Sequence, residues 1–203
     1  MPDAGQGVDD TGDGAIEKTQ PPVSGLRYPT PSELFTAIPQ IKKLVQHRPR
    51  EDEDAMGFLG RLRSSTTPEE SVTYAAFAAR PKMAIWWGYE CVRALPDELS
   101  DSDRELMEIV ARWTTYPDNE NRYAALRASL WETPRTPAVM LALAVGWSGG
   151  QIAPNDPAPV PIWRAPRSIN SAVLSCLSKV DLDRRSVLLA RFIDLSANLF
   201  RVY

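Results

Sequence analysis

Apolar residues recur along the chain at the three- and four-residue steps of an amphipathic helix. From residue 34 to residue 130 they form six such sets, which begin at Leu34, Phe58, Val72, Met83, Leu106 and Tyr123. Residues 138–147 are apolar on nearly all sides, as in a buried central helix, and residues 167–178 and 182–200 form a closing pair. Alternating apolar and polar runs of useful length do not occur. The pattern therefore predicts an all-α protein of about eight to ten helices.

Capping residues mark several helix starts at regular intervals. The motifs T-P-S-E at residues 30–33, T-P-E-E at 67–70 and S-D-R-E at 102–105 each combine an N-cap hydroxyl with a nearby glutamate. Thr136 followed by Pro137 marks a fourth start. Starts at 30, 67, 102 and 136 are spaced for one helical hairpin each. We therefore expect stacked antiparallel hairpins, either as an irregular bundle or as a short solenoid-like array.

The ends of this helical pattern divide the chain into regions. Residues 1–27 combine Gly, Asp, Gln and Pro with almost no large apolar side chains, which predicts a disordered acidic tail. Residues 28–203 are predicted to form a single helical domain. Within it, residues 149–166 contain five prolines after a Gly-Gly pair, which predicts an extended proline-rich loop.

Charge and composition narrow the function classes. The formal net charge of the 203 residues is −3, and residues 1–24 alone carry five acidic side chains against one lysine. The remaining body is near neutral, which argues against nucleic acid and membrane surfaces as partners. The longest apolar run, residues 138–147, is too short to cross a bilayer, and the first residues lack a secretory signal pattern. We expect a cytoplasmic protein in which Cys91 and Cys176 are free buried thiols.

Candidate chemistry is sparse. The one histidine, His47, lies at the end of a predicted helix, where a structural role is expected, and neither cysteine has the spacing of a metal ligand. Phosphate-binding and dinucleotide-binding glycine motifs are absent from the sequence, as is a serine nucleophile elbow. We expect no cofactor and no metal. Paired carboxylates such as Asp118 and Glu120 leave a helical enzyme open as an alternative.

Two aromatic clusters stand out from this background. Trp86 and Trp87 are adjacent in one predicted helix, which also carries Arg93. Adjacent helical residues point about 100° apart, so the two indoles cannot share one narrow stripe. Either the helix is central and buried on two sides, or one indole lines a binding groove.

The second cluster spans residues 112–122 and contains Trp113, Asp118 and Arg122. Asp118 can cap the helix that begins at the next residue, while Arg112 and Arg122 are placed to pair with Asp118 or Glu120. This cluster is either a structural helix–turn–helix corner or a ligand site.

These clusters resemble a bacterial family catalogued as a domain of unknown function, DUF6931. The similarity rests on T-P-E-E-S-V at residues 67–72, A-I-W-W at 84–87 with C-V-R at 91–93, and the W…P-D…N-R series between residues 113 and 122. It covers about residues 30–200 and implies no assigned chemistry. The family is associated with gene neighbourhoods of type VI-like secretion, so the resemblance implies an adaptor, chaperone or accessory role with a secreted effector or secretion component as partner.

We therefore expect a non-enzymatic protein-interaction module whose groove lies near the tryptophans. Its predicted partner-binding residues are Trp86, Trp87, Arg93, Trp113, Asp118, Arg122 and Trp163, the last as a lid on the proline-rich loop. Six tryptophans in 203 residues motivate this hypothesis, because tryptophan and arginine dominate interface hot spots. An immunity protein that neutralises a toxin through an acidic surface, and a helical enzyme acting through Asp118, Glu120 and Arg122, are the alternatives. Neither the oligomeric state nor the identity of the partner follows from the sequence.

Overall fold

The computed structural model describes residues 25–200, which form nine α-helices and three short 3-10 helices. Two isolated β-bridges are the only strand-like pairings within this range. The all-α prediction is confirmed. In chain order the elements are α1 (Pro31–Ala37), η1 (Pro39–Lys43), α2 (Ala55–Arg63), α3 (Glu70–Ala78), α4 (Pro81–Arg93), η2 (Pro96–Glu98), α5 (Asp101–Thr115), α6 (Asn119–Ser129), α7 (Pro137–Gly146), α8 (Arg164–Ser178), α9 (Leu182–Ala197) and η3 (Asn198–Phe200).

Three of the predicted caps form as expected. The hydroxyl of Thr30 accepts a hydrogen bond from the Glu33 amide at 3.2 Å, and that of Thr136 accepts from the Val139 amide at the same distance. The Asp118 carboxylate accepts from the Asn121 amide at 2.8 Å. In each case a side-chain oxygen satisfies one of the amides that a helix start leaves without an internal partner.

Two other predicted caps are wrong. The hydroxyl of Thr67 is buried without a hydrogen-bond partner among residues 25–200, and α3 begins three residues later behind Glu69. The capping box of α5 is made by Ser100 and Asp103, two residues before the predicted start at Ser102. Ser100 can do this because Asp103, which is buried, is also held by the Thr136 hydroxyl, a tertiary contact that the local pattern does not contain.

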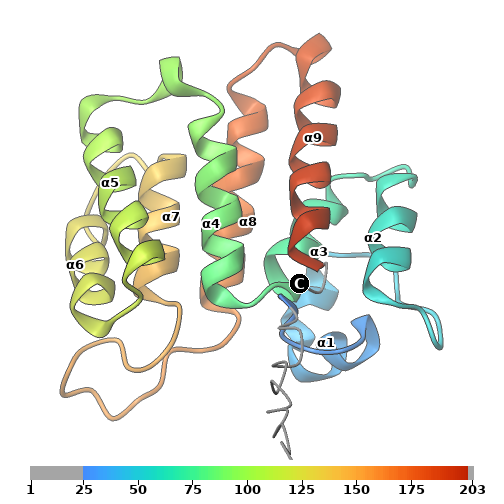
Figure 1. Cartoon of the computed structure of the whole chain (residues 1–203), viewed down its shortest axis with the longest axis horizontal. Coiled ribbons are helices and arrows are strands. Elements are labelled where there is room, and N and C mark those ends of the chain that lie inside the picture. Colours follow the sequence, from blue (N-terminus) through green and yellow to red (C-terminus); the bar gives the residue numbers. More distant parts are fainter. Residues whose placement is uncertain (1–24, 201–203) are drawn as a thin grey trace, which may run out of the picture.

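Consecutive helices from α4 to α9 run antiparallel, and α4 lies in front of α8 between α5 and α9 (Figure 1). Helix α8 contacts α3, α4, α7 and α9, so elements that are distant in sequence share one core. A solenoid would restrict each hairpin to its neighbours. The structure is therefore the irregular bundle, one of the two arrangements that the sequence left open.

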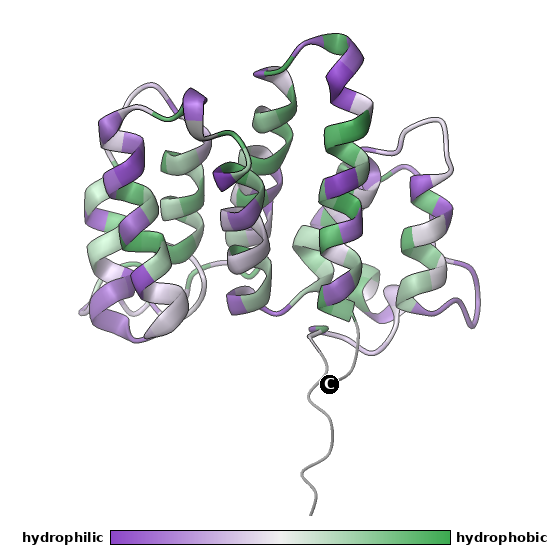
Figure 2. Cartoon of the chain, turned by 45° about the horizontal axis from the view of Figure 1, so that its top comes forward, coloured by the Kyte–Doolittle hydropathy of each residue, from purple (hydrophilic) through white to green (hydrophobic). Residues whose placement is uncertain are grey.

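Hydrophobic faces turn inward across the bundle and hydrophilic faces turn outward (Figure 2). Helix α7 is the exception predicted from the sequence, because nearly all of its residues are buried. Helix α8 begins at Arg164, inside the predicted loop 149–166. Pro166 is tolerated in its first turn, where no amide hydrogen is needed for the helical ladder.

The predicted tail lies mostly outside the described residues. Within it, residues 25–27 run along the junction of α3 and α4, where the Arg27 amide donates to Ala78 O at 2.8 Å and the Arg80 amide to Gly25 O at 2.7 Å. Gly25 is required here, because a Cβ atom would lie 2.0 Å from Leu199 O.

Candidate functional site

Helix α4 sits at the centre of the molecule and divides its side chains between core and surface. It begins with Pro81 at its first turn, which suits a position without a helical hydrogen bond. Trp87 is fully buried, and its indole N–H donates to Phe192 O in α9 at 3.0 Å. This hydrogen bond satisfies the only polar atom of a large apolar side chain. Trp87 is therefore a core residue and leaves the candidate binding surface.

Gly88, next to Trp87, lets α4 approach α7 and α8 closely. A Cβ atom at this position would lie 2.8 Å from Leu141 Cδ1 in α7 and 3.2 Å from Ile169 Cγ2 in α8. Cys91, one turn later, is also fully buried. Trp87, Gly88 and Cys91 thus define the face by which α4 packs into the bundle.

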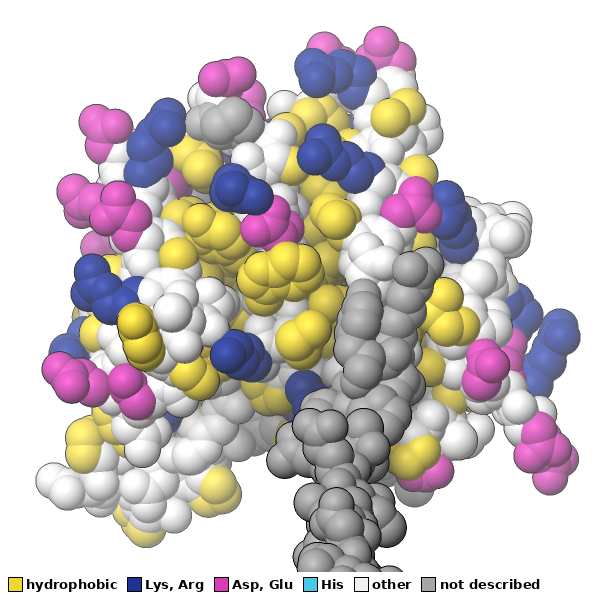
Figure 3. Space-filling view, in the orientation of Figure 1, with side chains coloured by type: hydrophobic (Ala, Val, Ile, Leu, Met, Phe, Trp, Pro, Cys, Tyr) yellow, Lys and Arg dark blue, Asp and Glu magenta, His cyan; other side chains and the backbone are white. Residues whose placement is uncertain are grey.

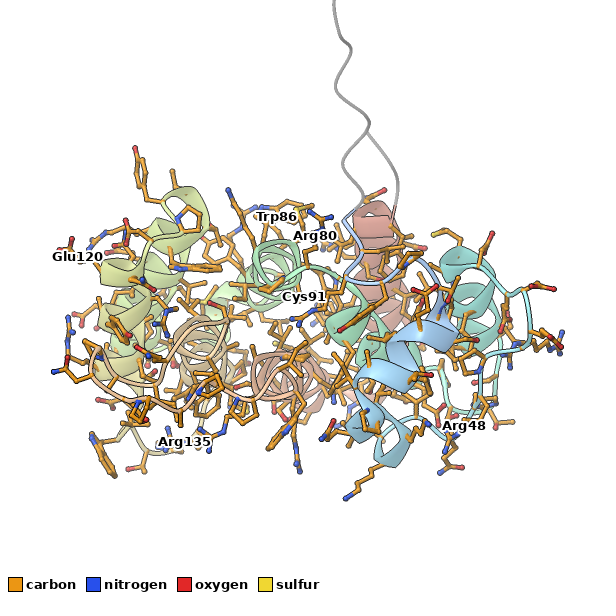
Figure 4. The ribbon with its side chains drawn as sticks, turned by 90° about the horizontal axis from the view of Figure 1, so that it is seen from below. Arg48, Arg80, Trp86, Cys91, Glu120 and Arg135 are labelled. Carbon is orange, nitrogen blue, oxygen red and sulfur yellow. The ribbon has the colours of Figure 1, made fainter. Side chains whose placement is uncertain are left out.

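Trp86 lies on the opposite side of the same helix and is 40% exposed. Figure 4 shows it pointing outward from α4 while Cys91 lies toward the interior. The pair of tryptophans therefore divides as helical geometry allows, with one indole in the core and the other on the surface.

Arg93 extends the exposed side of α4 toward its C-terminus. Its guanidinium donates to a Glu90 carboxylate oxygen at 2.6 Å and lies 5.9 Å from the centre of the Tyr89 ring. An exposed ion pair of this kind contributes little stability, because water screens both charges. Its effect is to hold the Arg93 side chain near the ring of Tyr89, which lies one turn beyond Trp86.

We call the exposed side of α4 the tryptophan face, formed by Lys82, Trp86, Tyr89, Glu90 and Arg93. Hydrophobic side chains gather over α4 between α5 and α9, with basic side chains above and below them (Figure 3). The five residues of the tryptophan face include two cations, Lys82 and Arg93, and one carboxylate, Glu90, a balance of +1. The tryptophan face is therefore apolar at its centre and basic at its ends.

Trp113 does not reach this face. It is 5% exposed and belongs to the buried cluster formed by all the main helices. Its indole N–H has no hydrogen-bond partner in the part of the chain that the structure describes, which is uncommon for a buried donor. The structure assigns Trp113 to the core of the α5 region.

The corner between α5 and α6 is a structural turn. Arg122 is 4% exposed, and its Nη1 donates to Gly146 O and to Gln151 O, both at 2.9 Å. Its Nε donates to the Asn119 side-chain oxygen at 3.1 Å. Arg122 therefore binds the end of α7 and the following loop, and the prediction that it pairs with Asp118 or Glu120 is wrong.

Asp118 and Glu120 are exposed at this corner. Asp118 is occupied as the N-cap of α6, and the Asn121 side-chain amide donates to it and to Tyr116 O. The structure does not assemble these carboxylates with Arg122 into a polar site.

Trp163 lies in a different part of the molecule from Trp86. It immediately precedes α8 and lines a hollow of about 510 Å³ with residues of η1, α3 and α8, namely Gln40, Lys43, Leu44, Phe77 and Arg167. It is half-buried against the core. The structure does not place Trp163 as a lid over the tryptophan face.

The other chemically active side chains have structural partners or are buried. His47 Nδ1 lies 2.8 Å from a Glu70 carboxylate oxygen, and the Gln46 and His47 amides also donate to this carboxylate. Burial favours a raised pKa for Glu70, but these hydrogen bonds outweigh it and lower the pKa. Within the described range, no group of three or more His, Cys, Asp or Glu side chains is arranged to hold a metal ion.

The two cysteines are unreactive by environment. Both are buried and neither forms a disulfide. Burial raises the pKa of the Cys91 thiol well above its usual value and that of Cys176 to about 12. Since the thiolate is the nucleophile, neither thiol is prepared for catalysis near neutral pH.

One exposed apolar surface was missed from the sequence. Leu182 and Val187 on α9 are 77% and 71% exposed. Both belong to a segment whose other apolar residues fit a helical core stripe, so helical phase alone could have shown that these two fall outside it.

The chain matches the model of one known protein family. Residues 58–200 match the family described as a family of unknown function, DUF6931. The chain belongs to this family, and the resemblance inferred from the tryptophan motifs is confirmed. No curated protein and no solved structure matches the chain. None of the helices in residues 25–200 is both long and apolar enough to cross a membrane.

Proposed function

We propose that this protein is a non-enzymatic protein-interaction module that binds its partner through the tryptophan face of α4. The observation that carries the proposal is Trp86, a large side chain that is 40% exposed and points outward from α4 between Lys82 and Arg93 (Figure 4). An exposed tryptophan with a neighbouring arginine matches the composition of interface hot spots. Its neighbour Trp87 holds the supporting helix in the core, so the face is presented on a rigid element.

The occupant that fits this face is an amphipathic helix with acidic side chains at its polar edges. A docked amphipathic helix buries apolar residues at three- and four-residue steps, which suits the row of side chains that Lys82, Trp86 and Arg93 form along α4. Lys82 and Arg93 lie on this face at opposite ends of α4. Carboxylates on the partner would meet these cations and guide its orientation.

The family resemblance extends the proposal to a partner class. A secreted effector or a component of a type VI-like secretion system, with this chain as adaptor or chaperone, is consistent with helix binding. The immunity alternative needs an acidic surface, whereas the tryptophan face has basic ends. The enzyme alternative needs Asp118, Glu120 and Arg122 together, and Arg122 instead binds main-chain carbonyls.

The proposal is tested by selecting helical peptides from a randomised display library against the purified full chain. We expect selected peptides to be amphipathic and enriched in Glu and Asp, and to lose at least about tenfold in affinity for Trp86→Ala, which corresponds to 1.4 kcal/mol or more. Binding should weaken as salt concentration rises, because part of the attraction is between exposed charges.

Tyr116→Ala is the matched control, since Tyr116 is a 65% exposed aromatic residue outside the tryptophan face. It should leave peptide affinity unchanged. Failure to select any helical peptide, peptides that bind Trp86→Ala as well as the parent chain, or selection without acidic enrichment would each contradict the proposal.

A further inference from the structure

Helix α9 presents apolar side chains on a surface that the tryptophan face does not use. Val187 is 71% exposed in the second turn of α9, and Leu182 at its first position is 77% exposed. The helix lies at the front of the molecule, beside α4, and its first turn is the highest part of the view (Figure 1). Because they are five residues apart, the two side chains point about 140° apart around α9, and only Val187 lies on the outward ridge. There it lines one shallow hollow together with Ala190 and Leu195, and an exposed apolar surface of this kind is a candidate contact for another molecule.

Two charged residues lie on the same ridge as Val187. Asp183 is four residues before it and Arg191 is four residues after it, so all three lie along one side of the helix. Neither Asp183 nor Arg191 has an ion pair within residues 25–200, whereas Asp194 on the same helix is paired with Arg63. The ridge therefore carries one acidic and one basic side chain that form no ion pair within the described residues.

A hollow lies on each side of this ridge. The first, of about 260 Å³, is formed with the end of α4 by Ala94, Leu95, Val180, Asp183, Arg184, Val187, Leu188 and Arg191. The second is shallower and follows α9 further, lined by Ser186, Val187, Ala190, Arg191, Asp194, Leu195 and Asn198. Val187 and Arg191 line both hollows. The surface thus offers a ridge together with an adjacent groove, which is the shape that packed helices exchange.

We propose that α9 forms an antiparallel homodimer with the α9 helix of a second copy, with Val187 near the twofold axis. In this register Asp183 of one copy lies opposite Arg191 of the other, and the arrangement occurs twice by symmetry. A twofold interface requires a surface that is complementary to itself, so that residue i meets residue j and residue j meets residue i. The order of acidic, apolar and basic residues on the ridge meets this requirement.

The charges also select the orientation and the partner. A parallel pairing would place Asp183 against Asp183 and Arg191 against Arg191, which is unfavourable. The three ridge residues carry no net charge and the adjoining hollow adds one cation, Arg184, so the surface lacks the large excess of one sign that would favour a strongly charged partner. A second copy carries the matching charges at the matching spacing.

The proposed antiparallel dimer is tested by exchanging the charges at positions 183 and 191. Sedimentation velocity over a range of concentrations should show the full chain dimerising with a dissociation constant on the order of 10 μM, because an interface of one helix per copy is at the small end of specific interfaces. Asp183→Arg and Arg191→Asp should each weaken dimerisation at least about tenfold, since each places like charges together. The double variant Asp183→Arg with Arg191→Asp should restore it, because the exchanged charges pair again across the axis.

Glu105→Arg, at an exposed position on α5, controls for the general effect of reversing a charge. It should dimerise like the parent chain, and circular dichroism should show that all variants keep their helical content. A parent chain that stays monomeric at 200 μM, about 20 times the expected constant, would overturn the proposal. So would a double variant that remains as weak as the single variants, or an equal loss in Glu105→Arg.

The dimer and the helix-binding surface can fail separately. Trp86→Ala should lose peptide binding and still dimerise, because Trp86 is not on the α9 ridge. Asp183→Arg should lose dimerisation and still bind the selected peptides. Loss of both properties in either variant would contradict the separation of the two surfaces.

Discussion

Helix α4 and the corner between α5 and α6 contain the same kinds of residues and use them differently. Each carries a buried tryptophan and an arginine, Trp87 with Arg93 in α4 and Trp113 with Arg122 at the corner. In α4 the arginine is exposed on a surface beside Trp86. At the corner the arginine is buried and binds main-chain carbonyls.

The two regions differ in the interactions that hold them in the fold. At the corner Arg122 ties the start of α6 to the end of α7 and to the loop after α7 through its hydrogen bonds. A buried guanidinium is stable there only because carbonyl and amide oxygens surround it. Helix α4 is held by apolar packing and one indole hydrogen bond, so its outer face can carry polar and aromatic residues without affecting the fold. An exposed arginine beside an exposed tryptophan is thus a candidate for binding, whereas a buried arginine is a structural element.

Removing Trp87 should have the largest effect on stability. Trp87→Ala leaves a cavity at the centre of α4 and removes the hydrogen bond to Phe192 O, so we expect the free energy of unfolding to fall by about 3–5 kcal/mol. Urea unfolding followed by circular dichroism measures this change. Trp86→Ala is the control on the same helix and should cost less, about 1–2 kcal/mol, because 40% of the residue is already in water and no hydrogen bond to the core is lost. Similar losses for the two variants would break the division of α4 into a core face and a surface face.

Removing the Arg122 guanidinium should have the next largest effect. Arg122→Met keeps most of the apolar volume but leaves Gly146 O and Gln151 O without these donors, so we expect a loss of about 2 kcal/mol. Hydrogen exchange should accelerate in residues 147–163, since this segment loses its contact with α6. Arg127→Met, an exposed arginine in the same helix, should change neither quantity. A stable Arg122→Met variant with unchanged exchange would show that the corner does not depend on its arginine.

Closing the gap at Gly88 should have a smaller but measurable effect. Gly88→Ala places a methyl group 2.8 Å from Leu141 Cδ1, and we expect a net destabilisation of about 1–2 kcal/mol, because over-packing outweighs the gain in helix propensity. Gly60→Ala in α2 has no atom within 4 Å of the new group and should be neutral or stabilising. Thermal unfolding of the two variants separates these contributions. If Gly88→Ala were as stable as Gly60→Ala, α4 could move away from α7 and α8 to admit the methyl group without a loss of stability.

Much of the fold could be predicted from local pattern. Thr30, Asp118 and Thr136 cap the helices they were expected to cap, since capping involves only residues within one turn. Thr67 and Ser102 were misassigned because a matching motif nearby does not show which hydroxyl the tertiary structure will use. The candidate site was predicted less well. Trp86 and Arg93 lie on the surface as expected, whereas Trp87, Trp113 and Arg122 are buried, and Trp163 lines a separate hollow.

The sequence by itself determined that this protein is helical, where most of its helices begin, that Trp86 and Trp87 face different directions, and which family the chain belongs to. Only the tertiary structure decided which of the two indoles is buried, what Arg122 binds, and that Trp163 lines a separate hollow. The physical reason is separation along the chain. Trp87 is 105 residues from its hydrogen-bond partner, and Arg122 is 24 and 29 residues from its two carbonyls. Helical periodicity determines the direction of a side chain, but the element that packs against it determines whether that side chain is buried or exposed.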